Sequence, residues 1–163
     1  MKRLILMRHA KSDWSGEALN DHDRTLNDRG RANAHALGDW LRDVGILPDE
    51  VLCSSAVRTQ ETLAGLDLPQ RINTTITRKL YLASQDQILS LLQRATGNSV
   101  LVLGHNPGVG MCADDIVATA PDHQQFMGFP TGATLIADFD VEDWSDAGWG
   151  KGRVVTFVVP RDL

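Results

Sequence analysis

The sequence has few cysteines and no long apolar run, and both shortages narrow the class of protein. Its only cysteines are Cys53 and Cys112, too few for a disulfide framework, so the cytoplasm is the expected compartment. No run approaches the roughly 20 apolar residues of a membrane-spanning helix, and the apolar part of "MKRLILMRHA" is too short for a signal peptide. A membrane is therefore not an expected partner. The formal net charge of -5 argues against nucleic acid as well.

Repeats, linkers and low-complexity segments are also absent. The 163 residues are therefore expected to form one domain, 1–163, with a core of its own. Three short runs are almost continuously apolar: residues 3–7 (RLILM), 50–53 (EVLC) and 99–104 (SVLVLG). Strands that are apolar on both faces are typical of a parallel sheet covered by helices on both sides.

Segments with helical periodicity separate these runs. Helices are expected over four ranges: 27–44, 55–66, 84–94 and 108–120. The expected capping residues are Asn27 with Gly45 as the stop, Ser54 or Ser55, and Ser84 with Gln87 as a capping box. Two further strands close the chain, at 133–140 and 153–160, as an antiparallel pair at one side of the sheet. The fold class predicted is a three-layer α/β sandwich, with a mostly parallel central sheet and helices on both faces.

Basic and histidine side chains follow three of the expected strands. Arg8 and His9 come directly after the first, Arg58 follows the second, and His105 follows the third. Open α/β sheets bind ligands beyond the carboxyl ends of their parallel strands, so these four side chains are expected to converge. Strand ends usually carry Gly, Asp, Asn or Ser, so the fold alone does not require this set.

The chemistry of that set is specific. Two guanidinium groups form a fork for a dianionic group such as a phosphoryl group. A histidine between them can attack phosphorus or move a proton, and nearby positive charge keeps its imidazole neutral. The same charge stabilises negative charge on the phosphoryl oxygens in the transition state.

Cys53 offers an alternative nucleophile, because "CSSAVR" resembles the phosphate loop of a cysteine-dependent phosphatase. That loop has five residues between cysteine and arginine, whereas four separate Cys53 from Arg58. The stretch also lacks glycines that would let the loop close tightly. Cys53 is therefore predicted to be a small buried residue of the second strand.

Three motifs resemble those of the histidine phosphatase superfamily. "LILMRHAKS" resembles its RHG signature, with Ala10 in place of glycine; "CSSAVRTQETL" resembles the second motif; and "VLVLGHN" resembles the third, a strand that ends in histidine. Within the superfamily, "DHDRTLNDRGRANA" and the closing "VVPRDL" are most similar to the SixA-like phosphohistidine phosphatases. The resemblance implies a phosphoglycerate mutase-like fold.

The resemblance also implies a role for each matching residue. His9 would be the nucleophile that forms a transient phosphohistidine, while Arg8 and Arg58 would bind the phosphoryl oxygens. His105 would bind the phosphoryl group and stabilise its transfer. The resemblance implies no metal and no organic cofactor.

A general acid found in phosphomonoesterases and mutases of the superfamily is missing. No carboxylate lies between Ile76 and Asp86, where that acid would be expected. An imidazole leaves phosphorus with less protonation than an alkoxide does, so the absence favours phosphohistidine as substrate, on a phosphorelay-type protein such as a phosphotransfer domain. The alternatives are a phosphomonoesterase for small phosphorylated metabolites, with Asp13 or Asp21 as the acid, and a non-catalytic module that reads phosphate.

Several other polar residues have two interpretations each. Lys11 either adds to the positive field at the site or is an exposed loop residue. Arg24 and Arg29 either line a groove where an acidic partner docks or are surface charges before and within a helix. His22, in "NDHDR", resembles half of a metal site, but a solvated loop is the better interpretation because no second ligand cluster is evident.

Overall fold

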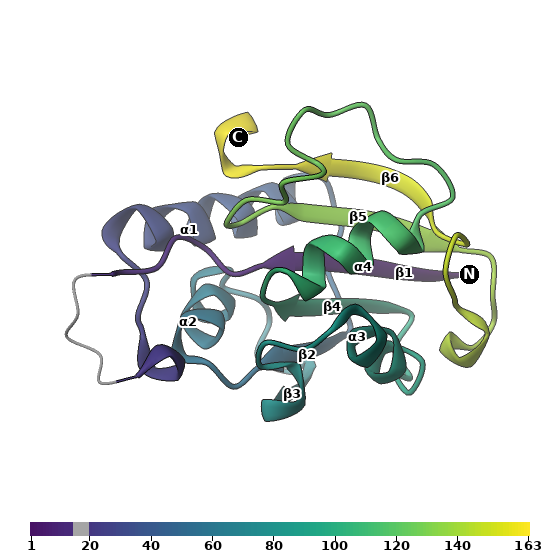
Figure 1. Cartoon of the computed structure of the whole chain (residues 1–163), viewed down its shortest axis with the longest axis horizontal. Coiled ribbons are helices and arrows are strands. Elements are labelled where there is room, and N and C mark those ends of the chain that lie inside the picture. The colour runs from purple at the N-terminus through teal and green to yellow at the C-terminus, as the bar shows by residue number, and fades with distance from the viewer. Residues whose placement is uncertain (15–19) are drawn as a thin grey trace.

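A computed structural model describes residues 1–14 and 20–163 of the chain. Within this part, six strands form one mixed sheet in the order β3-β2-β4-β1-β5-β6 (Figure 1). The four strands from β3 to β1 are parallel, and β5 and β6 add an antiparallel pair beside β1. The strands are β1 Lys2–Arg8, β2 Glu50–Ser54, β3 Asn73–Thr77, β4 Ser99–Gly104, β5 Thr134–Phe139 and β6 Arg153–Val158.

Helices cover both faces of this sheet, as the apolar strands predicted. Figure 1 shows α3 and α4 in front of the sheet and α1 behind it, and α2 packs on α1. The helices are α1 Asp28–Asp43, α2 Val57–Gly65, α3 Gln85–Leu92 and α4 Gly108–Ile116. Short 3-10 turns are η1 Asp21–Asp23, η2 Arg78–Leu80, η3 Trp144–Asp146 and η4 Pro160–Asp162. None of the described helices is long and apolar enough to cross a membrane.

Strand β1 shows why a continuous apolar run suits a central strand. Leu4 and Leu6 pack into the core under α3 and α4, whereas Ile5 and Met7 pack into the core under α1 and α2. Successive side chains of a strand point to opposite faces, so a strand buried on both faces must be apolar at every position. The predicted three-layer sandwich with a mostly parallel sheet is confirmed.

Two of the predicted helix caps are confirmed. The Asn27 side chain accepts a hydrogen bond from the Gly30 amide at 2.8 Å, and Gly45 adopts the left-handed φ of 71° that ends α1. Ser84 and Gln87 form the predicted capping box, with bonds of 3.2 and 2.8 Å.

Two other expectations about helix ends are wrong. Helix α2 begins after Ala56 without a side-chain cap, because the hydroxyls of Ser54 and Ser55 bond to histidines instead. Helix α4 ends at Ile116 rather than at residue 120, since Val117 leaves the helix to form a bridge with Gly152.

Strand β3 was not predicted from the sequence. It pairs in parallel with β2 at the sheet edge, and most of its side chains are exposed. Its sequence, NTTIT, carries a single apolar residue, so the apolar pattern that marks the other strands is missing there. Backbone hydrogen bonds to β2 rather than side-chain burial hold this strand in place.

Helices α1 and α2 approach closely at Gly38. A Cβ atom at this position would lie 2.2 Å from the carbonyl oxygen of Leu66, at the C-terminal end of α2. Only glycine allows this contact, although alanine is the better helix former by about 1 kcal/mol. The contact sets the spacing of the two helices behind the sheet.

We therefore expect Gly38→Ala to lower the free energy of unfolding by about 1–3 kcal/mol, because backbone must move to admit the methyl group. Urea denaturation followed by circular dichroism measures this change. Gly148→Ala is the matched control, since the nearest atoms to its added Cβ lie 3.9 Å away in the Lys151 side chain. An alanine at 38 that left stability unchanged or raised it would contradict the packing described.

Candidate active site

The carboxyl ends of β1, β2 and β4 lie side by side and bring the four predicted site residues together. Arg8 is in register with Gly104, the residue before His105. The rings of His9 and His105 lie with their centroids 5.3 Å apart and their planes inclined at 53°. His9, Arg58 and His105 are 5%, 3% and 2% exposed, and Arg8 is partly buried.

The backbone around His9 is held from three sides. The His9 amide donates to the Gly104 carbonyl at 3.1 Å, and the His9 carbonyl accepts from the Gly132 amide at 2.9 Å. The Ala10 amide donates to the Thr62 hydroxyl at 3.0 Å. The position of the imidazole is therefore set by the sheet, by the 129–132 turn and by α2.

Three buried donor nitrogens of the site have no hydrogen-bond partner. They are Arg8 Nε, Arg58 Nε and His105 Nδ1, and among the described residues only one other buried side-chain polar atom, Ser99 Oγ, is similarly unpaired. Leaving a buried donor unpaired costs about 1–3 kcal/mol, so native proteins rarely tolerate it. Three such donors in one site fit a ligand that is rich in hydrogen-bond acceptors and negatively charged.

The hydrogen bond of His9 determines its tautomer. His9 Nδ1 lies 2.7 Å from the Ala10 carbonyl oxygen, which can only accept, so Nδ1 carries the proton and Nε2 keeps a lone pair. Burial and the charges of Arg58, Arg8 and Arg24 together lower the pKa of His9 to about 4, against the opposite effect of the Ala10 bond. At neutral pH His9 is therefore an uncharged imidazole with a free Nε2 lone pair.

Ser54 orients the second histidine. Its hydroxyl oxygen lies 2.7 Å from His105 Nε2 and accepts the Ala56 amide at 3.3 Å, and its own proton is available to donate to Nε2. In that arrangement His105 carries its proton on Nδ1, the unpaired nitrogen. Burial, together with the neighbouring His9 and Arg58, lowers the pKa of His105 to about 3, so the ring is neutral at neutral pH.

Asp21 binds Arg58 from the side away from the unpaired Nε. Arg58 donates from Nη1 to the Asp21 carbonyl at 2.7 Å and from Nη2 to the Asp21 carboxylate at 3.0 Å. Arg24 and the Tyr81 hydroxyl also donate to this carboxylate, at 2.6 and 2.5 Å. Burial alone would raise the pKa of Asp21, but the bonds from Tyr81 and Arg58 lower it to about 2. Asp21 is thus an ionised acceptor at neutral pH.

Sequence reasoning missed Ser54 as a histidine partner and Tyr81 as a site residue. The Tyr81 ring packs edge-on against His105 with centroids 5.5 Å apart. Tyr81 lies in the stretch from 76 to 86, which has no carboxylate before Asp86. The sequence signal for Tyr81 is its hydroxyl, a hydrogen-bonding group in the stretch where the acid of related enzymes is expected.

The remaining candidates lie around this centre. Arg24 bonds to Asp21 and Ser12, and its guanidinium lies 3.4 Å from the centroid of the Trp14 ring. Its positive charge is close enough to His9 to contribute to the lowered pKa of that ring. Lys11 is exposed and lines a separate groove together with Arg29. His22 Nε2 bonds to Ser55 Oγ at 2.9 Å. No group of three His, Cys, Asp or Glu side chains suited to a metal occurs in the described part of the chain.

Cys53 is placed as the spacing predicted. It is fully buried, and its thiol donates to the Ser54 carbonyl at 3.3 Å. Burial raises the pKa of the Cys53 thiol to about 12, so it stays protonated and is a poor nucleophile.

Comparison with known proteins agrees with this geometry. A family model, the histidine phosphatase superfamily (branch 1), matches residues 4–81, which include Arg8, His9 and Arg58 but end before His105. An uncharacterized protein of Mycobacterium tuberculosis is 34% identical over 164 residues, 95% of this chain and 100% of the relative.

Two solved structures share the fold over nearly the whole chain. One, from Nakamurella multipartitia, is 28% identical with a TM-score of 0.85, over 98% of this chain and 96% of that chain. The other, from Agrobacterium tumefaciens, is 27% identical with a TM-score of 0.80, over 98% of each chain. Both carry the provisional name phosphohistidine phosphatase SixA. The chain belongs to the histidine phosphatase superfamily, in its SixA-like group.

Proposed function

We propose that this protein is a metal-independent phosphatase that hydrolyses phosphohistidine through a covalent intermediate on His9, and that residues 1–163 form its single domain. The observation that carries the proposal is the set of three unpaired donors around a histidine whose Nε2 is unprotonated. Donors fixed in a buried site stabilise the charge of a transferring phosphoryl group without reorganisation. The names of the two solved SixA-like structures support the choice of phosphohistidine.

In the first step, the His9 Nε2 lone pair attacks phosphorus in line with the phosphorus–nitrogen bond of the substrate. That bond breaks, its electron pair goes to the substrate imidazole nitrogen, and this nitrogen takes a proton from water. Arg8 Nε, Arg58 Nε and His105 Nδ1 donate to the three phosphoryl oxygens. The Ala10 carbonyl holds the proton on His9 Nδ1 and so stabilises the positive charge that develops on the ring.

In the second step, water attacks phosphorus from the side opposite His9. The bond from Nε2 to phosphorus breaks, and its electron pair returns to Nε2. The attacking water loses a proton as inorganic phosphate forms, and this proton neutralises the hydroxide left when the substrate imidazole took its proton from water in the first step. The net reaction converts phosphohistidine and water into histidine and phosphate. His9 ends as it began, with its proton on Nδ1.

The state of Asp21 supports phosphohistidine over a phosphate ester. With a pKa of about 2, Asp21 carries no proton to give to an alkoxide at neutral pH. The Tyr81 hydroxyl is engaged with the same carboxylate. A leaving imidazole, which needs less help from an acid, suits such a site better than a sugar alcohol does.

The proposed partner is a protein that bears phosphohistidine, such as a phosphotransfer domain, or a small phosphorylated substrate. The cytoplasm stays the expected compartment because the two cysteines, Cys53 and Cys112, are both free and buried.

The direct test follows phosphate release from phosphohistidine, free and on a peptide, in the presence of EDTA. We expect turnover by the wild type, and a loss of more than about 1,000-fold in kcat/KM for His9→Ala because the nucleophile is gone. Phosphate trapped on His9 should be acid-labile and alkali-stable. Equal release by both proteins would overturn the proposal.

A panel of phosphomonoesters in the same assay separates the alternatives. We expect kcat/KM for phosphohistidine to exceed that for sugar phosphates by at least about 100-fold. Faster turnover of a sugar phosphate that depends on Asp13 or Asp21 would instead indicate a phosphomonoesterase. Tight binding without turnover or trapping would indicate a phosphate-reading module.

A pair of substitutions in the second motif tests which residue of "CSSAVR" matters. Arg58→Ala should lower kcat/KM by about 100-fold or more, because a donor to the phosphoryl group is lost. Cys53→Ser is the matched control and should keep most of the activity, since the thiol stays protonated in the core. Abolished turnover in a folded Cys53→Ser protein would show that the thiol is required.

The protonation states of the two histidines can be measured by NMR on protein labelled with ¹⁵N-histidine. His9 should titrate near pH 4 and His105 near pH 3, because burial and the neighbouring arginines lower both pKa values. Both rings should therefore be neutral between about pH 5 and 8 and carry their proton on Nδ1. Spectra of His9→Ala and His105→Ala supply the assignments, and a His9 midpoint at 6.5 or above would contradict this tautomer and charge.

A further inference from the structure

A polar groove of about 220 Å³ lies beside the backbone of the site and is lined by three cations. Lys11 comes from the loop after β1, Arg29 from the first turn of α1, and Arg161 from η4. Asn33, Gln125 and Thr131 complete its polar wall. Three segments that are far apart in the sequence thus contribute one positive side chain each.

The positive charge of this groove is not balanced within the described part of the chain. None of the three cations forms an ion pair with a described carboxylate, and no acidic residue lines the groove. The acidic neighbours of Arg29 and Arg161 in sequence, Asp28 and Asp162, pair with Arg31 and His123. In a protein with a net charge of -5, three unpaired cations around one groove form a local field of the opposite sign.

The groove is tied to the nucleophile through the backbone. Lys11 lies two residues after His9, and its carbonyl accepts from the Asn27 amide at 3.1 Å. That carbonyl also lies against Gly30, where a Cβ atom would be only 2.0 Å away. On the other wall, Thr131 precedes Gly132, whose amide donates to the His9 carbonyl. Two walls of the groove are therefore formed by segments that also carry or hold the backbone of His9.

We infer that this groove binds an acidic segment of a protein substrate, with carboxylates that flank the phosphohistidine. The inference rests on the proposed function and names the kind of partner that the site takes. The groove is smaller than the roughly 300–1,000 Å³ of pockets that enclose whole small molecules, so it suits a few side chains. Exposed Arg and Lys on separate walls match carboxylates spread along a peptide, and such pairs act mainly on association and specificity.

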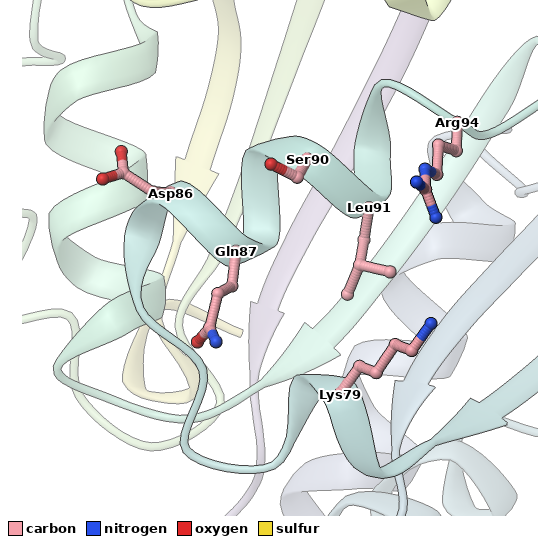
Figure 2. A pocket seen from close by; sticks show the side chains of 6 residues that line it. All are labelled: Lys79, Asp86, Gln87, Ser90, Leu91 and Arg94. Carbon is pink, nitrogen blue, oxygen red and sulfur yellow. The ribbon is translucent and has the colours of Figure 1, made fainter.

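A second hollow, beside η2 and α3, supplies a matched control. It has a volume of about 360 Å³, and Figure 2 shows Lys79 of η2 and Arg94 after α3 reaching toward it from two sides. Asp86 also lines this hollow. Removal of Lys79 and Arg94 changes the net charge as much as removal of Arg29 and Arg161, but leaves the groove intact.

The probes are two histidine peptides phosphorylated with phosphoramidate, one with four aspartates flanking the phosphohistidine and one with four asparagines. For the wild type we expect kcat/KM to be about ten-fold higher for the aspartate peptide at low salt, and the preference to fall at 0.5 M NaCl. The Arg29→Ala/Arg161→Ala protein should lose this preference but hydrolyse free phosphohistidine as the wild type does. The Lys79→Ala/Arg94→Ala protein should keep it.

Two results would overturn the inference. The first is a wild type that hydrolyses the aspartate and asparagine peptides equally well. The second is an equal loss of the preference in both double variants, which would show that the net charge of the whole protein, and not the groove, causes it. Binding of the two unphosphorylated peptides to His9→Ala, measured by fluorescence anisotropy, separates this inference from the proposed function. If no phosphohistidine substrate is hydrolysed, the proposed function fails. Selective binding of the aspartate peptide, lost on Arg29→Ala/Arg161→Ala, would still support the groove, and equal binding of both peptides would reject it.

Discussion

The burial of positive and nitrogen-rich groups at one edge of the sheet is the constraint on which the rest of the site depends. Arg58 and His105 are almost completely buried, yet each keeps a donor nitrogen without a partner. Removing a charged or polar side chain from water is unfavourable, so neighbouring residues must offset this cost with hydrogen bonds or ion pairs. Asp21 does so for Arg58, and Ser54 does so for His105. Each partner bonds one side of its residue and leaves the other side directed to a ligand.

Asp21 links this constraint to the choice of reaction. The carboxylate that holds Arg58 is kept ionised by Arg58, Arg24 and Tyr81, so the same contacts that order the arginine prevent Asp21 from acting as an acid. A site built in this way offers several unpaired nitrogens to a ligand but gives little protonation to a leaving group. A substrate whose leaving group is an imidazole fits that balance.

Features that depend on residues close together in the sequence were predicted correctly, whereas several features that depend on distant segments were missed. The strands β1, β2 and β4 were predicted because burial on both faces requires an apolar residue at every position, and the Ser84 capping box was predicted because it joins residues three positions apart. Strand β3 was missed because its side chains are exposed, and its position depends on hydrogen bonds to β2. Ser54 and Ser55 were expected to cap α2, since their hydroxyls favour helix starts. The structure instead pairs them with His105 and His22, which come from distant segments.

The sequence by itself determined which groups stand at the strand ends: two arginines and two histidines after three apolar runs, and a cysteine one residue too near Arg58 for a phosphate loop. Strand periodicity and residue spacing are local properties, so they can be read along the chain. Only the tertiary structure decided the protonation and the partners of those groups. The bonds from Arg58 to Asp21 and between Ser54 and His105 join residues 37 and 51 positions apart, and both exist because separate loops pack over the same sheet edge.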